Sequence, residues 1–223
     1  MAKIMFVNDF EWENLGIMYI SSVLKAHGHV CDLILSNQSA EKILQSIKEF
    51  HPDIIGFSVM TVDQNSTLKL ANLLKKNGVA ALIIAGGPHP TFFPDFIHNE
   101  CIDIINRGEG EYSLLELANA VDNHSDIREI QNLYVKKDGK IYKNPLRPLV
   151  DMDELPDPDI DLFYKFGVTN YYGRYNFSAS RGCPYGCSYC FNHKWNNLYK
   201  TYGKQKVIRL KPVEKLINES KNK

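Results

Sequence analysis

Three cysteines lie within eight residues near the C-terminal end of this 223-residue sequence. Their spacing is Cys-x-x-x-Cys-x-x-Cys, at Cys183, Cys187 and Cys190. Three thiolates from one short loop can bind a soft metal ion or an iron–sulfur cluster, and Gly182 and Gly186 allow the loop to curl around it. A four-iron cluster has four corners, so three protein ligands leave one iron open to a small molecule. The triplet therefore favours an iron–sulfur cluster with one open site.

Two other roles of cysteine compete with this interpretation. The first is a structural zinc site with His193 as a fourth ligand, although the spacing differs from the paired Cys-x-x-Cys units of common zinc ribbons. The second is a buried free thiol, which suits the isolated Cys31 and Cys101 better than the triplet. Five cysteines, an odd number in a chain without a secretion signal, argue against a disulfide framework.

The first 122 residues alternate between short apolar runs and segments of helical periodicity. The runs are nearly continuous in apolar residues, which is typical of parallel strands buried on both faces. We therefore expect an α/β domain over residues 1–122, with a Rossmann-like (flavodoxin-like) doubly wound parallel sheet. The expected strands are Lys3–Asn8, Val30–Leu35, Asp53–Val59, Ala80–Ala85 and Asp103–Asn106. The expected helices are Leu15–His27, Ala40–Phe50, Asn65–Lys76, Phe93–Asn99 and Glu111–Val121.

The alternation stops after residue 122. Leu133–Val135 and Ile141–Asn144 predict a hairpin joined by an Asp-Gly turn. Four prolines between Pro145 and Asp161 exclude a long helix or a central strand there. We therefore interpret residues 123–174 as a hairpin followed by an extended linker.

Residues 175–223 are expected to begin a second domain. The pattern predicts a strand at Asn176–Ser180, the cysteine loop at Gly182–Cys190 and a helix at Val213–Ser220. From Lys194 onwards there are nine Lys or Arg against two acids, which we interpret as a solvated helix face and a frayed tail.

The loops at the carboxyl ends of the expected strands are the candidate ligand site, because open parallel sheets bind ligands there. They contain neither a Gly-x-Gly-x-x-Gly fingerprint nor a P-loop. Gly86 and Gly87 would let the backbone approach a flat ligand closely, or would only form a tight turn. Glu109 and Glu111 would equally complement the dipole of the following helix. His89 stands between two prolines, so a structural role is as consistent with the sequence as a ligand contact.

Five segments spread over the sequence share the pattern of one known enzyme class. They are Arg181–Cys190, Leu15–Ile20, Gly86–Thr91, Gly108–Glu111 and Leu155–Asp159. The first resembles the signature of radical S-adenosylmethionine (radical SAM) enzymes. The other four are similar to the N-terminal cobalamin-binding domain and linker of the B12-dependent radical SAM class. The resemblance thus covers nearly the whole chain.

The resemblance implies a [4Fe-4S] cluster held by Cys183, Cys187 and Cys190, with the open iron chelated by S-adenosylmethionine. Tyr189 and Phe191 would lie next to the adenine. In the family, the reduced cluster passes an electron to the sulfonium and releases a 5′-deoxyadenosyl radical, or S-adenosylmethionine supplies a methyl group at a cobalamin. An electron donor such as a flavodoxin or ferredoxin is implied as a partner, together with a substrate that the sequence does not identify.

The resemblance also implies a cobalamin over the sheet edge. Many cobalamin domains supply a cobalt-ligating His from an Asp-x-His-x-x-Gly motif, but Asn8–Gly16 contains no His. The cobalt would therefore lack that ligand, or the domain has kept the fold and lost the cofactor. The implied contacts are Asn14, Leu15, Gly16, Ser58, Val59, Thr61, Gly86, Gly87, Pro88, His89, Gly108, Glu109 and Glu111.

The charge balance and hydropathy of the sequence bear on its partners and its cellular location. The 26 basic residues balance the 26 acidic residues, so nothing global points to nucleic acid or to an anionic membrane. No apolar run approaches the ~18 residues of a membrane span, and the N-terminus lacks a signal-peptide profile, so we expect a cytoplasmic protein.

The segment after the cysteine loop is short. Only 33 residues come after Cys190, whereas a complete (β/α) barrel takes roughly 200 residues or more. The expectation is therefore the N-terminal portion of a B12-dependent radical SAM enzyme for methyl transfer or a related reaction, ending in the first βα unit of a truncated barrel. Such a chain would be a fragment, a truncated gene product or a half that needs a partner. The rival hypotheses are a corrinoid carrier or sensor with a vestigial cysteine loop, and a zinc-stabilised interaction module.

Overall fold

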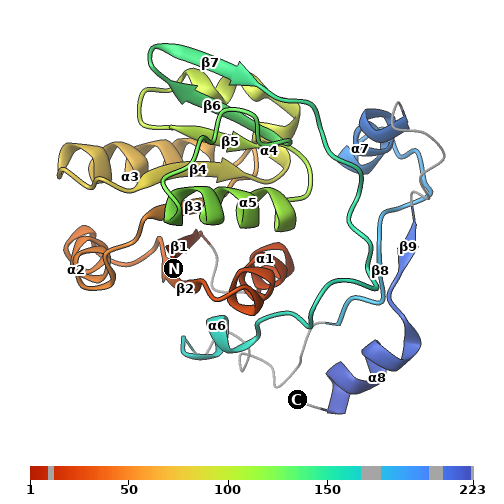
Figure 1. The fold of residues 1–223 in the computed structure, drawn as a ribbon. Helices are drawn as coiled ribbons and strands as arrows, with labels where there is room; N and C mark the ends of the chain where they lie inside the picture. Colours follow the sequence, from red (N-terminus) through yellow and green to blue (C-terminus); the bar gives the residue numbers. More distant parts are fainter. Residues whose placement is uncertain (10–12, 167–176, 201–207, 222–223) are drawn as a thin grey trace.

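Seven strands form one mixed sheet in the computed structural model, which describes residues 1–9, 13–166, 177–200 and 208–221 (Figure 1). The strand order is β2-β1-β3-β4-β5-β6-β7. The first five are parallel, and β6 and β7 add an antiparallel edge. The strands are β1 (Lys3–Asn8), β2 (Val30–Leu35), β3 (Ile54–Ser58), β4 (Leu82–Gly86), β5 (Ile104–Asn106), β6 (Leu133–Lys137) and β7 (Lys140–Lys143).

Helices cover both faces of this sheet because successive strand residues point to opposite sides. On one face, Ile4, Phe6 and Ile84 pack with helices α1 and α5. On the other face, Met5 and Ile83 pack with α2, α3 and the 3-10 helix η1. The bounds are α1 (Leu15–Ala26), α2 (Ala40–Phe50), α3 (Gln64–Lys76), α4 (Pro88–Phe92), η1 (Pro94–His98) and α5 (Glu111–Asp122).

The predicted fold class is confirmed by this topology. The order 2-1-3-4-5 of the parallel strands is that of flavodoxin-like sheets, with a reversal between β1 and β3. All five predicted strands are present, with shifts of at most two residues at their ends. A ligand that obeys the general rule for open sheets would lie beyond the carboxyl ends of β1 and β3, next to β4 and β5.

One predicted helix differs from the structure. The expected loop before Phe93 contains the short helix α4, and the expected helix at Phe93–Asn99 is the 3-10 helix η1. Phe93 separates the two with φ −122° and ψ 68°. Pro94 accounts for this break, because the proline ring disfavours the helical conformation of the residue before it. Pro88 suits the start of α4, where its missing N–H costs no hydrogen bond.

The hairpin and the linker pack on the α/β domain more closely than the sequence indicated. Asp138 and Gly139 form the predicted turn with φ values of 52° and 71°, as a tight hairpin turn requires. Strand β6 then pairs with β5 and extends the main sheet. The linker has no long helix or strand, but Val150, Met152 and Leu155 are buried in the core against α1 and α5.

The C-terminal segment lies beside this domain and contains the cysteine loop (Figure 1). The predicted helix Val213–Ser220 is present as α8, whereas α7 was not predicted. Of the described residues in the predicted strand, only Ser180 lies in a strand, β8, which pairs antiparallel with β9. Residue 176 of the predicted strand Asn176–Ser180 and the predicted domain boundary at 174/175 lie outside the described residues. No described helix is long and apolar enough to cross a membrane. The bounds are α6 (Asp161–Tyr164), β8 (Ser180–Arg181), α7 (Phe191–Tyr199), β9 (Arg209–Leu210) and α8 (Val213–Lys221).

Candidate functional site

A cavity of about 380 Å³ opens at the carboxyl ends of β1, β3, β4 and β5. Its volume is within the range of small-molecule sites, roughly 300–1,000 Å³. It begins between the sheet-edge loops and continues inward between the sheet and α1, where Phe6, Gly56 and Ile84 line it. Gly56 packs closely on Phe6 at this inner end, because a Cβ there would lie 3.2 Å from Cδ1 of Phe6. The cavity is therefore a largely apolar slot with a polar mouth.

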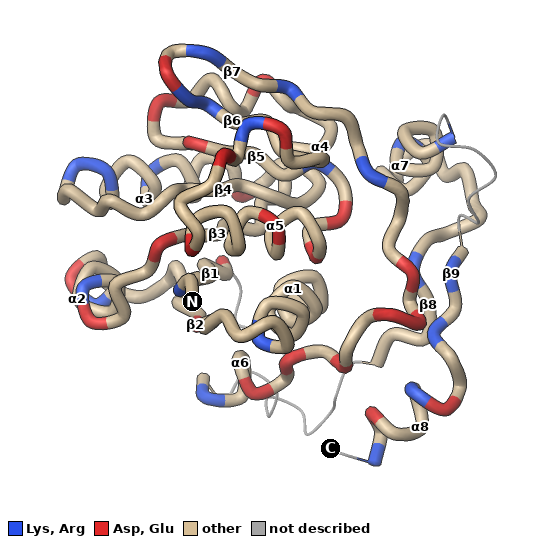
Figure 2. Tube along the Cα trace, viewed as in Figure 1, with Lys and Arg blue, Asp and Glu red and all other residues tan. Residues whose placement is uncertain are grey.

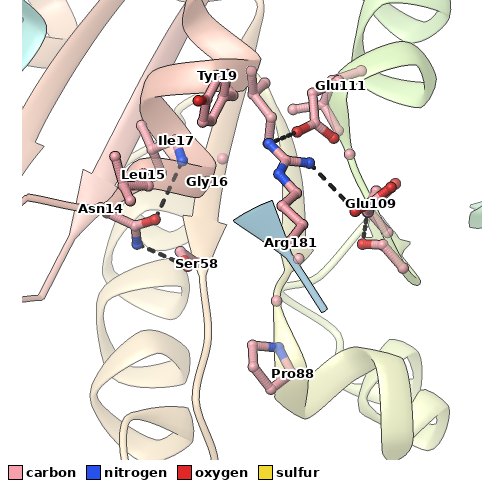
Figure 3. Close-up of a pocket in the computed structure, with 18 of the residues that line it drawn as sticks. Asn14, Leu15, Gly16, Ile17, Tyr19, Ser58, Pro88, Glu109, Glu111 and Arg181 are labelled. Carbon is pink, nitrogen blue, oxygen red and sulfur yellow. Dashed lines mark hydrogen bonds and ion pairs between the residues drawn. The ribbon is translucent and has the colours of Figure 1, made fainter. Parts of the chain in front are cut away.

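Asn14 forms one side of the mouth and fixes the start of α1 (Figure 3). It is the N-cap residue of that helix, and its Oδ1 accepts a hydrogen bond of 3.2 Å from the backbone N of Ile17. Its Nδ2 donates to Oγ of Ser58 at 3.1 Å. The bond joins the loop after β1 to the last residue of β3, and so links the two strand ends at the reversal of strand order.

Two glycine loops form the opposite side of the mouth. Gly87 has φ 97°, and a Cβ there would lie 3.0 Å from the carbonyl oxygen of Val59. Gly108 has φ 79°, and a Cβ there would overlap the hydroxyl of Tyr199. Thr91 joins the loops, because its Oγ1 accepts from N of Gly108 at 3.0 Å and donates to O of Gly87 at 2.8 Å. Glycine suits both positions because of their positive φ, and at Gly87 also because the backbone of Val59 lies so close.

Charged side chains close the mouth on the side of the C-terminal segment. Arg181 lies between two carboxylates, 2.5 Å from Oε1 of Glu111 and 3.3 Å from Oε1 of Glu109 (Figure 3). Its guanidinium also lies over the ring of Tyr19, 4.7 Å from the centroid. Burial disfavours the charged guanidinium, but the attraction of Glu111 and Glu109 outweighs it and raises the pKa of Arg181 above its usual value. Arg181 therefore stays charged.

Helix α7 covers the cavity with aromatic side chains. Phe191 and Trp195, one turn apart, both line the cavity. Their ring centroids lie 6.2 Å and 6.4 Å from that of Phe92 in α4. Trp195 in turn packs on Tyr199, the buried residue that contacts Gly108. Aromatic packing thus places the helix after the cysteine loop against the sheet edge.

Most of the cofactor contacts expected from the sequence line this one cavity, and four do not. Val59 is fully buried, Thr61 is exposed outside the cavity lining, and Tyr189 is 91% exposed. His89 lies away from the cavity, because its ring stacks on Phe93 and its Nδ1 lies 3.2 Å from Oγ1 of Thr61. The residues that line the cavity are Asn14, Leu15, Gly16, Ser58, Gly86, Gly87, Pro88, Gly108, Glu109, Glu111 and Phe191.

The surroundings of His89 favour a structural role for this residue over a ligand contact. The side chain is 6% exposed and touches a second ring, Phe96, edge-on at 5.0 Å. Burial lowers the pKa of His89, so the neutral imidazole is favoured. A neutral, aromatic-packed histidine fits a role in holding α4 to η1.

The cavity also contains residues that sequence reasoning missed. The sequence pattern predicts that the basic C-terminal run, which includes Arg209, lies in solvent. In the structure the side chain of Arg209 is only 14% exposed and lines the cavity. Arg181 is part of the signature segment, but the resemblance assigns it no role. Trp195 follows Phe191 by four residues, a helical spacing that places both rings on one face of α7. Asn106 ends β5, and its buried side chain donates to O of Gly108 at 3.1 Å.

The three loop cysteines lie on one partly exposed loop beside this cavity. Arg181 and Gly182, which line the cavity, directly precede Cys183. Asn196 of α7 holds the loop by donating from Nδ2 to O of Cys183 at 2.8 Å. In the part of the chain that the structure describes, no group of three or more His, Cys, Asp or Glu side chains is arranged to hold a metal ion.

Thiol chemistry should separate the loop cysteines from the two others. Burial raises the pKa of the Cys31 thiol to about 12, and it also raises the pKa of the Cys101 thiol. At pH 8 only about one Cys31 thiol in ten thousand would be the reactive thiolate. We expect iodoacetamide to label Cys183, Cys187 and Cys190 of the metal-free protein within minutes, and Cys31 and Cys101 only after unfolding. Mass spectrometry of the labelled peptides measures this, and rapid labelling of all five would contradict the described burial.

Fold and cavity together define a class of protein. A glycine-lined cavity at the carboxyl edge of a flavodoxin-like sheet is a ligand-binding arrangement of the Rossmann-like class. Within that class, residues 3–118 match the family model of the B12 binding domain. The chain therefore belongs to the B12-binding domain family.

Curated relatives extend the similarity beyond this domain. An uncharacterized methyltransferase of Pyrococcus horikoshii is 32% identical over 81% of this chain and 42% of its own length. The cobalamin-dependent radical SAM methyltransferase TokK of Streptomyces tokunonensis is 27% identical over 62% of this chain and 22% of its own length. The chain is thus homologous to cobalamin-dependent radical SAM methyltransferases, and it spans less than half the length of these two relatives.

A solved structure shares the fold. The cobalamin-dependent S-adenosylmethionine radical enzyme OxsB, with aqua-cobalamin and S-adenosylmethionine bound, superposes with a TM-score of 0.79 at 23% identity. The similarity covers 100% of this chain and 31% of that chain. At this identity the match supports the arrangement of the helices and strands.

Proposed function

We propose that this chain is the N-terminal portion of a cobalamin-dependent radical SAM enzyme that transfers a methyl group or performs a related radical reaction. In this proposal it binds cobalamin at the sheet edge and a [4Fe-4S] cluster that cleaves S-adenosylmethionine in the cysteine loop. One observation carries the proposal. Arg181 and Gly182, directly before the first loop cysteine, line the same cavity as the sheet-edge glycines of a B12-binding domain.

The residues at the sheet edge fit a cobalamin. Gly86 and Gly87 present backbone without a side chain at the mouth, as the approach of a flat macrocycle requires. The cavity is smaller than a whole cobalamin, so only a part of the ligand would enter the slot beside Gly56. Asn14 and Ser58 would supply polar contacts at the rim. No histidine lines the cavity among the described residues, so the described residues offer the cobalt no imidazole there.

The cysteine loop fits a cluster by the chemistry of its donors. Cys183, Cys187 and Cys190 are soft ligands on one partly exposed loop, and Gly186 has open space around it. Phe191 would offer an aromatic face to the adenine from the cavity wall. When bound, the cluster supplies the electron that cleaves the sulfonium, and the cobalamin carries the methyl group. A cytoplasmic flavodoxin or ferredoxin would be the electron donor.

The experiment is anaerobic reconstitution of the metal-free chain, once with iron and sulfide and once with cobalamin. We expect about four irons per chain and one tightly held corrinoid. Iron, sulfide, zinc and cobalt are measured after gel filtration. Stoichiometric zinc without iron would favour the zinc-stabilised module. Corrinoid without iron would favour the carrier or sensor with a vestigial cysteine loop.

A further inference from the structure

Four buried charges join the sheet edge to the strands that flank the cysteine loop. Glu109 comes from the turn before α5, Glu111 is the first residue of α5, and Arg181 and Arg209 come from β8 and β9. The side chains are 9%, 3%, 18% and 14% exposed, in that order. Two carboxylates and two guanidiniums make the group neutral, and we name it the Glu–Arg cluster. Figure 2 shows the basic positions of β8 and β9 beside the α/β domain.

The contacts within the Glu–Arg cluster are short and directional. Arg209 binds both carboxylate oxygens of Glu109, at 2.5 Å and 2.9 Å. Arg209 also donates to O of Val150 at 2.5 Å, and N of Val150 donates to Glu109 at 2.7 Å. The linker is thereby fixed to the same carboxylate. Arg181 completes the group by bridging Glu109 and Glu111. Bidentate arginine–carboxylate pairs of this kind restrict orientation as well as distance.

Both glutamates offset the repulsion between two arginines that face each other. Arg181 and Arg209 are directly paired residues of the antiparallel ladder β8–β9. Directly opposed side chains lie on one face of such a pair, and like charges there repel. Glu109 contacts both guanidiniums, and Glu111 contacts Arg181, so the carboxylates offset the repulsion. Without them the ladder would hold two buried, mutually repelling cations.

The backbone around Glu109 is also fixed in place. O of Glu109 accepts from Nδ2 of Asn132 at 2.7 Å, and Asn132 is fully buried. Gly110 lies directly against Ile20, since a Cβ there would approach Cδ1 of Ile20 to 2.9 Å. Glu109 therefore projects from a fixed turn that ends at Glu111, the first residue of α5. The carboxylates that the family resemblance places against cobalamin have arginines as their partners in this structure.

We propose that Glu109 and Glu111 are positioning residues, which hold the cysteine loop at the mouth of the cavity through Arg181 and Arg209. Arg181 is two residues before Cys183, so its anchorage fixes where the loop begins. The consequence for metal uptake rests on the proposed function of the cysteine loop. The anchorage itself does not, because it is a property of the metal-free chain.

The test compares Glu111→Gln, Arg181→Gln and the double variant with Glu116→Gln as matched control. Glu116 lies on the same helix, is 47% exposed and pairs with Arg147, so its change removes one surface ion pair. Hydrogen exchange is measured on the metal-free chain at the amides of residues 179–181 and 209–211. These residues form the β8–β9 ladder and the bond from N of Lys211 to O of Ala179.

We expect each single variant of the Glu–Arg cluster to accelerate ladder exchange about tenfold and to lower the thermal unfolding midpoint. In the double variant the midpoint should return towards that of the unmodified chain, because no buried charge is left without its partner. Ladder exchange should stay fast, because the link to α5 is still absent. If the pair were merely structural, the unfolding midpoint and the ladder exchange rate would both recover in the double variant, and that result would overturn the proposal. Unchanged ladder exchange in the single variants would overturn it as well.

Metal and corrinoid binding give the second readout. Iron per chain after reconstitution should fall several-fold in both single variants and in the double variant, but not in Glu116→Gln. Affinity for cobalamin should change much less. If the unmodified chain takes up no iron, the proposed function fails, and ladder exchange alone then decides the positioning role. Full iron uptake by Glu111→Gln with an unchanged electron paramagnetic resonance spectrum of the reduced cluster would overturn the positioning role.

Discussion

Replacing Cys187 by alanine is expected to reduce iron after anaerobic reconstitution from about four per chain to near zero. Cys187 is the middle ligand of the triplet, so its loss leaves two thiols, Cys183 and Cys190, separated by seven positions of the chain. A cubane with one iron already open to a small molecule would then have two irons without a protein ligand. Such a cluster should be lost during gel filtration. Iron, acid-labile sulfide and the visible charge-transfer absorbance measure the effect.

Ser188→Ala is the matched control for this prediction. Ser188 lies next to Cys187 in the same loop and is exposed, so its change tests the loop without removing a thiol. Iron content should equal that of the unmodified chain. Retention of full iron by Cys187→Ala would remove the triplet from the proposed function. Loss of stoichiometric zinc, in place of iron, would assign the same three residues to a structural zinc site.

The α/β fold was accessible from the sequence because its determinants are local. Leu15–Ala26 starts at an Asn that caps the helix with its own side chain and stops before Gly28, whose φ is 82°. Helix Ala40–Phe50 matches its predicted bounds, with Ser39 as the N-cap. Five nearly continuous apolar runs between such helices leave the parallel sheet as the arrangement that buries both faces. The location of the loops at the carboxyl ends of the strands is then a consequence of topology.

The details that the sequence did not reveal depend on contacts between distant residues. Arg209 belongs to a basic run that a local interpretation leaves in solvent, but its mostly buried side chain pairs with Glu109, 100 positions away in the chain. The position of His89 shortly after β4 suggests a place near the ligand, but its ring packs on Phe93 and Phe96 and does not line the cavity. Strand β6 joins the main sheet because the edge of β5 is open to it, which no local pattern indicates.

Replacing Gly87 by alanine is expected to destabilise the metal-free chain by about 2–4 kcal/mol. Two causes act together. With φ 97° and ψ −170°, Gly87 has a conformation that is essentially restricted to glycine. The new Cβ would also lie 3.0 Å and 3.1 Å from O and N of Val59, and backbone atoms cannot rotate away as a side chain would. The measurement is urea unfolding followed by far-ultraviolet circular dichroism.

Gly86→Ala provides the contrast that isolates this cause. Gly86 directly precedes Gly87 at the end of β4 and also lines the cavity, but its φ is not in the left-handed region. A Cβ there would meet only Cβ of Asn106 at 3.7 Å, an ordinary contact. The free energy of unfolding should therefore change by less than about 1 kcal/mol. Equal destabilisation by both changes would contradict the close approach of Gly87 to Val59. Because Gly86→Ala leaves the fold intact, a loss of cobalamin affinity in this variant would report on the mouth of the cavity itself.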